Sequence, residues 1–249
     1  MRIILSPAKQ MKEDADSLPW LETPLFLDKA RRVLEALRAL DYPALRTLWG
    51  CNESLARLNA ARLAEMDLDR RLTPAILAYA GIQYKYMAPE VFTDTEFAYV
   101  REHLRILSGF YGLLRPFDGV RPYRLEMGAK LAVDGKKDLY HFWADAPARA
   151  LAAECDCVVD LASREYSLAV SRHLPAGVRL VRCVFAVEKG DKLVEKATLC
   201  KMARGEMVRW MAQNRVERPE QLREFTGQGF CFSARHAGAD RLVFVRRGG

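Results

Sequence analysis

The sequence predicts an α+β protein that forms a single domain over residues 1–249, with a mixed β-sheet and surrounding helices. Three observations lead to this fold class. A short β-branched run opens the chain, segments of helical periodicity follow it, and strand-like and helical segments alternate after residue 157. Half of the residues are hydrophobic and 29% are charged, as in ordinary globular proteins.

The first part of the chain contains one predicted strand and two predicted helices. Arg2–Leu5 is an apolar, β-branched run that Ser6-Pro7 ends, so we expect a strand that enters a loop. Apolar residues recur at helical spacing near 27–40 and again near 53–66, which predicts an amphipathic helix in each segment.

The next segments are less regular. Ala75–Gly81 is a compact apolar run that fits a buried strand or a buried helix equally well. Thr93 and Glu96 have the spacing of a capping box, which predicts a helix that continues through Arg105. Two glycines three residues apart then mark a hairpin-like turn within Leu107–Gly119.

The last part of the chain alternates between helical and strand-like patterns. The predicted elements are a helix near 143–154, a central strand at Cys157–Ala162, strand-like segments at Val178–Val187 and Lys192–Leu199 around a hairpin at Glu188–Asp191, a helix at Met202–Asn214 and a strand at Arg241–Arg246.

Composition excludes several classes of protein. No apolar run approaches the roughly 20 residues of a membrane span, and the N-terminal apolar stretch is too short for a signal peptide. We therefore expect a cytoplasmic protein, a monomer, with no membrane partner. The six cysteines and four histidines show no metal-ligand spacing, so no metal site and no cofactor is predicted.

Positive charge is concentrated in the second part of the chain. The net charge is +7; residues 1–163 hold 22 basic and 23 acidic residues, whereas residues 164–249 hold 17 basic and 9 acidic residues. A smaller excess lies in residues 101–137, with 8 basic and 4 acidic residues. Such clustering favours a polyanionic partner, nucleic acid first, although many modestly basic proteins bind no polyanion.

The sequence contains no Walker loop, G-x-G-x-x-G or G-x-S-x-G motif. Ser6-Pro-Ala-Lys9 places a hydroxyl and an ammonium just beyond a predicted strand, where open-sheet proteins often bind ligands. This arrangement fits anion binding or a serine nucleophile activated by lysine, and it fits a surface turn equally well.

Two further clusters combine arginine or lysine with glycine or aromatic residues. Arg115, Arg121 and Arg124 lie among aromatic residues, which suits phosphate contact and base stacking, or a structural pairing of one arginine with Glu126. A second cluster, on one predicted helix face, consists of Lys201, Arg204 and Arg209. Its shortage of acidic partners favours anion binding over a solvated charged face.

Six segments in order carry a resemblance to a known family. They are Ser6-Pro-Ala-Lys9, Leu107-Ser-Gly-Phe-Tyr-Gly-Leu-Leu-Arg-Pro116, Pro122-Tyr-Arg-Leu-Glu-Met-Gly128, Asp138-Leu-Tyr-His-Phe-Trp143, Leu161-Ala-Ser-Arg-Glu-Tyr166 and Ala203-Arg-Gly205. With these segments the chain resembles the bacterial peroxide stress protein YaaA family. Residues 12–25 and 234–240 do not obviously match that pattern.

The resemblance implies a cytosolic protein that protects cells from hydrogen peroxide by limiting free intracellular iron. It also implies a positively charged cleft and a helix-hairpin-helix-like element that binds DNA phosphates through backbone amides. We map the hairpin onto Ser108–Gly112, preceded by a helix at 94–106, with Gly109 and Gly112 allowing close approach of the phosphate.

Two functional hypotheses follow, and a catalytic activity is left open. The first is a non-catalytic protein that binds duplex DNA without sequence preference through Lys9, Ser108, Gly109, Gly112, Arg115, Arg121, Arg124, Lys201, Arg204 and Arg209. The alternative is an enzyme acting on a nucleotide or a damaged nucleobase in the same cleft, in a pocket formed by Ser6, Glu126, Ser163, Glu165 and Tyr166. Convergence of Lys9, Lys201 and Glu165 in a closed pocket favours the enzyme, and an open groove favours binding. Iron sequestration by the protein itself is disfavoured, because no E-x-x-H or similar ligand set is present.

Overall fold

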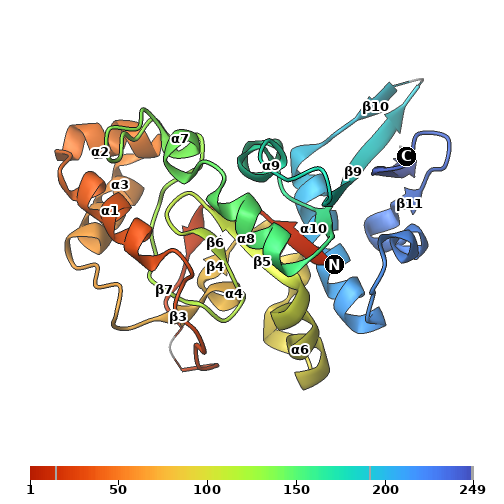
Figure 1. Cartoon of the computed structure of the whole chain (residues 1–249), viewed down its shortest axis with the longest axis horizontal. Helices are drawn as coiled ribbons and strands as arrows, with labels where there is room; N and C mark the ends of the chain where they lie inside the picture. The colour runs from red at the N-terminus through yellow and green to blue at the C-terminus, as the bar shows by residue number, and fades with distance from the viewer. Residues whose placement is uncertain (15, 191, 248–249) are drawn as a thin grey trace.

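A computed structural model describes residues 1–14, 16–190 and 192–247. Its central feature is a mixed sheet in the order β11-β12-β9-β8-β1-β5-β6, with β10 paired to β9 (Figure 1). The strands are β1 (Arg2–Leu5), β5 (Leu104–Ser108), β6 (Gly112–Leu114), β8 (Cys157–Asp160), β9 (Arg179–Lys189), β10 (Lys192–Val194), β11 (Cys231–Phe232) and β12 (Arg241–Arg247). The five strands from β12 to β5 run parallel, and β6, β10 and β11 pair antiparallel at the edges.

Helices surround this sheet. They are α1 (Leu27–Arg38), α2 (Tyr42–Trp49), α3 (Glu53–Ala64), α4 (Ala75–Ala78), α5 (Ile82–Met87), α6 (Asp94–His103), α7 (Leu139–Trp143), α8 (Ala146–Glu154), α9 (Arg164–Ser171) and α10 (Ala197–Asn214), with 3-10 turns at Pro89–Val91, Pro219–Glu224 and Gly227–Gly229. Helices α1 to α3 gather at one end of the molecule, and the C-terminal segments lie at the other (Figure 1). Two small ribbons pair β2 (Gln10–Met11) with β4 (Tyr79–Ala80) and β3 (Thr73–Pro74) with β7 (Gly119–Val120).

The centre of the sheet is where the strand order reverses. From β1 the chain first reaches β5 on one side and later returns to β8 on the other, with Ile3 opposite both Leu104 and Val159. In open parallel sheets, ligands bind in the crevice outside the carboxyl ends of the strands at such a reversal. A ligand site is therefore expected among the residues that follow β1 and β8.

The predicted sheet with its surrounding helices is confirmed, as are several of its parts. The N-terminal strand and the two amphipathic helices lie where the sequence places them. Thr93 and Glu96 form the capping box, with the Thr93 N–H donating to Glu96 Oε2 at 2.7 Å. The antiparallel pairing of β9 and β10 is also as predicted, while Asp191 of the predicted turn lies outside the described residues.

Three predicted boundaries are wrong. The helix predicted through Arg105 ends at His103, because Leu104 already belongs to the fully buried strand β5 beside β1. The helix predicted near 143–154 begins at Ala146, because Trp143 ends the separate helix α7 and Ala144 has a positive φ of 46°. The strand predicted to extend to Leu199 ends at Val194, and α10 begins three residues later, at Ala197. The ambiguous run 75–81 is a short helix between two-residue strands.

The predicted helix-hairpin-helix at Ser108–Gly112 is wrong. The segment is the tight turn of the β5–β6 hairpin, in which Ser108 pairs with Gly112. The Ser108 hydroxyl oxygen accepts the N–H groups of Phe110 and Tyr111 at 3.1 and 2.8 Å. Because the whole turn is buried, its amides are used inside the protein and do not face a phosphate.

Candidate functional site

A cavity of about 540 Å³ lies beyond the carboxyl ends of β1 and β8. Its walls come from the loop 6–10 after β1, residues 80–83 leading into α5, the segment 123–126, Ser163, Glu165 and Tyr166 at the start of α9, and Lys201 and Arg204 on α10. A crevice of this size at the reversal of strand order is typical of a small-molecule site.

Ser6 joins the two central strands at the floor of this cavity. Its Oγ accepts the Ser163 N–H at 2.8 Å and donates to Ser163 Oγ at 3.2 Å. Its carbonyl oxygen accepts the Gln83 side-chain amide at 2.8 Å and the Tyr84 hydroxyl at 3.1 Å. Two hydrogen bonds hold the Ser6 hydroxyl and two hold its backbone carbonyl, so the residue is fixed in one position, as a preorganised site requires.

Both carboxylates of the cavity are held by one contact each. Lys9 Nζ lies 2.8 Å from Glu126 Oε1, which ties the loop after β1 to the opposite wall. Glu165 Oε1 accepts the Gly128 N–H at 2.8 Å. Since a carboxylate has two oxygens with several lone pairs, each side chain retains acceptor capacity for a ligand.

Helix α10 brings two cations to the cavity, Lys201 and Arg204. Gly205 allows α10 to pack directly on α5, because a Cβ at this position would overlap the carbonyl oxygen of Gln83. Within the described chain neither cation forms an ion pair, and the buried Arg204 Nε has no hydrogen-bond partner.

Two buried tyrosines complete the lining. Burial raises the pKa of Tyr123 to about 12 and the pKa of Tyr166 well above its ordinary value. Tyr123 is held in a chain of hydroxyls, 2.6 Å from Ser108 Oγ and 2.9 Å from the Tyr79 hydroxyl. Both phenols therefore stay protonated at neutral pH and offer an aromatic surface beside the charged groups.

Comparison with known proteins decides the family. A sequence model described as Peroxide stress protein YaaA matches residues 1–236. The chain belongs to the peroxide stress protein YaaA family. It is 47% identical to a UPF0246 protein of Lachnoclostridium phytofermentans over 99% of this chain and 96% of the relative. A UPF0246 protein of Desulfitobacterium hafniense is 48% identical over 99% and 98% of the two chains. The resemblance expected from the sequence is confirmed, and the family name supports a role in peroxide stress.

In this YaaA-family chain the cavity gathers one group of the site residues singled out from the sequence. They are Ser6, Lys9, Arg124, Glu126, Ser163, Glu165, Tyr166, Lys201 and Arg204. Gln83 and Tyr84, which hold the Ser6 carbonyl, were not singled out. The pairing of β2 with β4 brings them to Ser6, and this long-range contact leaves no signal in the local sequence.

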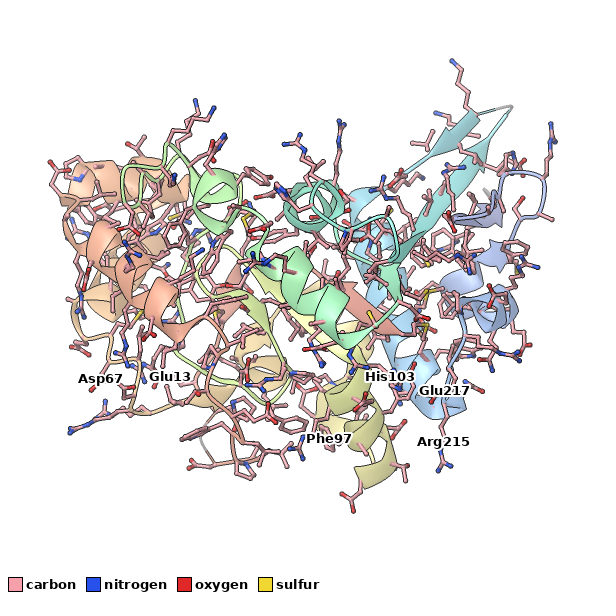
Figure 2. All side chains as sticks on the ribbon, in the orientation of Figure 1. Glu13, Asp67, Phe97, His103, Arg215 and Glu217 are labelled. Carbon is pink, nitrogen blue, oxygen red and sulfur yellow. The ribbon has the colours of Figure 1, made fainter. Side chains whose placement is uncertain are left out.

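The remaining residues singled out from the sequence lie elsewhere. Arg115 is paired with Glu22 and Asp118, at 2.6 and 3.0 Å. Arg121 is buried and lies 3.2 Å from Glu13, which Figure 2 labels. Each of these arginines is thus ion-paired within the chain, and neither lines the cavity. Arg209 is on α10 but lines a separate surface depression with Lys85, Trp210 and others.

The buried glycines of the hairpin support the cavity instead of lining it. A Cβ at Gly109 would lie 2.8 Å from the carbonyl oxygen of Leu125, so the cavity wall at 123–126 rests directly on the hairpin turn. Gly112 has a φ of +74°, and a Cβ there would lie 2.8 Å from the ring of Trp143. The hairpin segment Ser108–Gly112 therefore acts here through packing.

Among the described residues, no three His, Cys, Asp or Glu side chains are grouped so that they could hold a metal ion. All six cysteines are free thiols. No helix in the described ranges has the length and apolar character needed to span a bilayer.

Proposed function

We propose that this YaaA-family protein is an enzyme that acts on a nucleotide or a damaged nucleobase in the cavity beyond β1 and β8 during peroxide stress. The observation that carries the proposal is the convergence of Lys9, Lys201 and Glu165 on one cavity, around a serine fixed by four hydrogen bonds. Peroxide and iron(II) generate radicals that damage nucleobases, which connects this substrate class with the family's stress role.

The cavity supplies the groups that such a reaction uses. The second carboxylate oxygen of Glu165 is available to accept or return a proton. The Ser6 hydroxyl accepts the Ser163 N–H and donates to Ser163 Oγ, which leaves the Ser163 O–H to donate to a substrate oxygen or a phosphate. Tyr123 and Tyr166 offer buried aromatic rings for a base.

The test is a screen of the purified full-length chain against nucleotides, nucleosides and nucleobases, including 8-oxoguanine derivatives. Binding is read by thermal shift, and turnover by liquid chromatography with mass spectrometry. We expect turnover of at least one compound, with a loss of roughly a hundredfold or more in Glu165→Gln and in Ser6→Ala. Lys85→Ala, an exposed cation on α5 outside the cavity, is the matched control and should retain wild-type turnover. Absence of any turnover, or turnover unaffected by both cavity variants, contradicts the proposal.

A second candidate function is sequence-independent binding of duplex DNA. It is favoured by the basic excess of residues 164–249, which hold 17 basic and 9 acidic residues. Contacts of this kind release counterions, so affinity should fall with salt with a log–log slope of roughly −0.9 per phosphate contacted. Fluorescence anisotropy with a labelled duplex at increasing salt is the test, and affinity that is indifferent to salt contradicts it. Limitation of free iron, which the family resemblance implies, stays a prediction.

A further inference from the structure

The charged side chains of the cavity do not balance. Four cations line it, namely Lys9, Arg124, Lys201 and Arg204, against the two carboxylates Glu126 and Glu165. Lys9 and Glu126 neutralise one another at 2.8 Å. The remaining groups leave a net charge of +2 in a partly enclosed site, where electrostatic attraction is stronger than in water. An anionic ligand is thus favoured over a neutral or cationic one.

Arg204 marks where the anionic group of the ligand would bind. Arg204 lines the cavity and forms no ion pair among the described residues; its Nε is enclosed by protein, so the terminal nitrogens of the guanidinium are the donors that a ligand would meet. Lys201 lies three residues earlier on α10, so the two side chains project from adjacent turns of one helix face. A guanidinium with a neighbouring ammonium matches the oxygens of a phosphate.

The carboxylates of Glu126 and Glu165 favour hydrogen-bond donors of the ligand over its anionic group. The unengaged oxygens of Glu126 and Glu165 can only accept hydrogen bonds when ionised, and they repel a phosphate. Nucleobase edges carry N–H donors that such oxygens accept, and the Tyr123 and Tyr166 rings adjoin them in the lining. The cavity therefore matches a ligand that carries an anion at one end and N–H donors at the other.

We propose that Arg204 and Lys201 form a phosphate subsite and that the substrate is a nucleoside monophosphate, not the free nucleoside or base. The inference rests on the proposed function, because it assigns a substrate class to the same cavity. The dianionic phosphate monoester matches the net charge of +2, and a cavity of about 540 Å³ is in the size range of sites for ligands of this kind.

The test measures binding of three probes by calorimetry: inorganic phosphate, a panel of nucleoside monophosphates, and the matching nucleosides. We expect at least one monophosphate to bind roughly tenfold to a hundredfold more tightly than its nucleoside, as hydrogen bonds to a charged group predict. This preference should disappear in Arg204→Gln and shrink in Lys201→Ala, while Lys85→Ala retains it. Because Lys201 is exposed, its variant keeps the fold even if Arg204→Gln does not.

The outcomes separate the two proposals. If nucleosides bind or turn over as well as their monophosphates, the phosphate subsite is refuted and the enzyme proposal survives. If inorganic phosphate binds through Arg204 but no nucleoside or nucleotide does, the subsite stands and the nucleotide function fails. If no probe binds, both are overturned. A duplex that competes with a bound monophosphate would overturn the free nucleotide as the substrate and assign the subsite to nucleic acid.

Discussion

The hairpin region 104–121 and helix α10 carry similar sequence signals but have different roles. Both contain glycine and arginine among apolar residues. In the hairpin region the arginines at 115 and 121 are paired with carboxylates, and the turn is buried. On α10, Lys201 and Arg204 line a cavity and have no ion-pair partner within the described residues. The comparison indicates that a basic segment is available to an anion only where the fold leaves its charge unpaired.

The largest effect is expected from Gly112→Val in the hairpin. Valine disfavours a φ of +74°, and its Cβ would lie 2.8 Å from the Trp143 ring. We expect the free energy of unfolding to fall by more than about 3 kcal/mol, measured by urea denaturation. Gly177→Ala is the control, since nothing lies within 4 Å of its added Cβ, and it should change stability by less than about 0.5 kcal/mol. A Gly112→Val protein of wild-type stability that loses DNA binding would restore the hairpin as a ligand site.

Local sequence patterns predicted which segments form helices and strands, but they did not predict which segments pack against one another. The β-branched run at Arg2–Leu5 and the capping box of Thr93 and Glu96 are local signals, and both are confirmed. Leu104–Ser108 was predicted partly as helix because the signal for its strand is burial beside β1, which depends on the whole fold.

The same limit applies to the candidate site. The motifs around Ser6 and Ser163 were visible in the sequence, but the pairing of β1 with β8 that joins them was not. Likewise, Glu22 lies far from Arg115 in the chain, so the neutralisation of that arginine could not be predicted. Whether an arginine is structural or available to a ligand depends on which residues lie next to it in the fold, and local sequence does not show these.

The next effect, from Gly205→Ala on α10, tests how the cavity wall is held. In an exposed helix interior, alanine is favoured over glycine by about 1 kcal/mol. In Gly205→Ala the free energy of unfolding should instead fall by about 2 kcal/mol. The added Cβ would overlap the Gln83 carbonyl oxygen and push α10 away from α5. Urea denaturation measures the change. A stabilised variant would show that α10 does not pack on α5 in this way.

A smaller and pH-dependent effect is expected from Arg115→Ala. Burial raises the pKa of Asp118 from 3.8 to about 7, opposed by hydrogen bonds and charge from Arg115. The native state thus keeps a proton that the unfolded chain loses, so stability falls as pH rises from about 4 to about 7. Removing Arg115 raises this pKa further and extends the fall above pH 7.

The loss of stability in Arg115→Ala should therefore be small near pH 4 and reach about 1 kcal/mol above pH 7, because solvent screens this partly exposed pair. Thermal denaturation across this pH range measures it. Adding Asp118→Asn to the variant removes the titrating carboxyl and should abolish the pH dependence of the deficit. A deficit that is largest at acidic pH would contradict the assignment of Asp118 as the titrating group.

The smallest effect on stability, and the sharpest contrast with the hairpin, is expected from Lys201→Glu. Lys201 is exposed and has no ion-pair partner among the described residues, so reversing its charge should change the free energy of unfolding by less than about 0.5 kcal/mol.

If duplex DNA binds over the cavity, Lys201→Glu should weaken the binding of all DNA sequences alike and lower the salt slope by about one per lost contact. Arg115→Ala, measured at a pH where it is folded, should bind DNA with wild-type affinity, because Arg115 is paired with Glu22 and does not line the cavity. The reverse result, with Arg115→Ala weakening binding and Lys201→Glu leaving it intact, would return the DNA contact to the hairpin region and contradict the division of roles between the two segments.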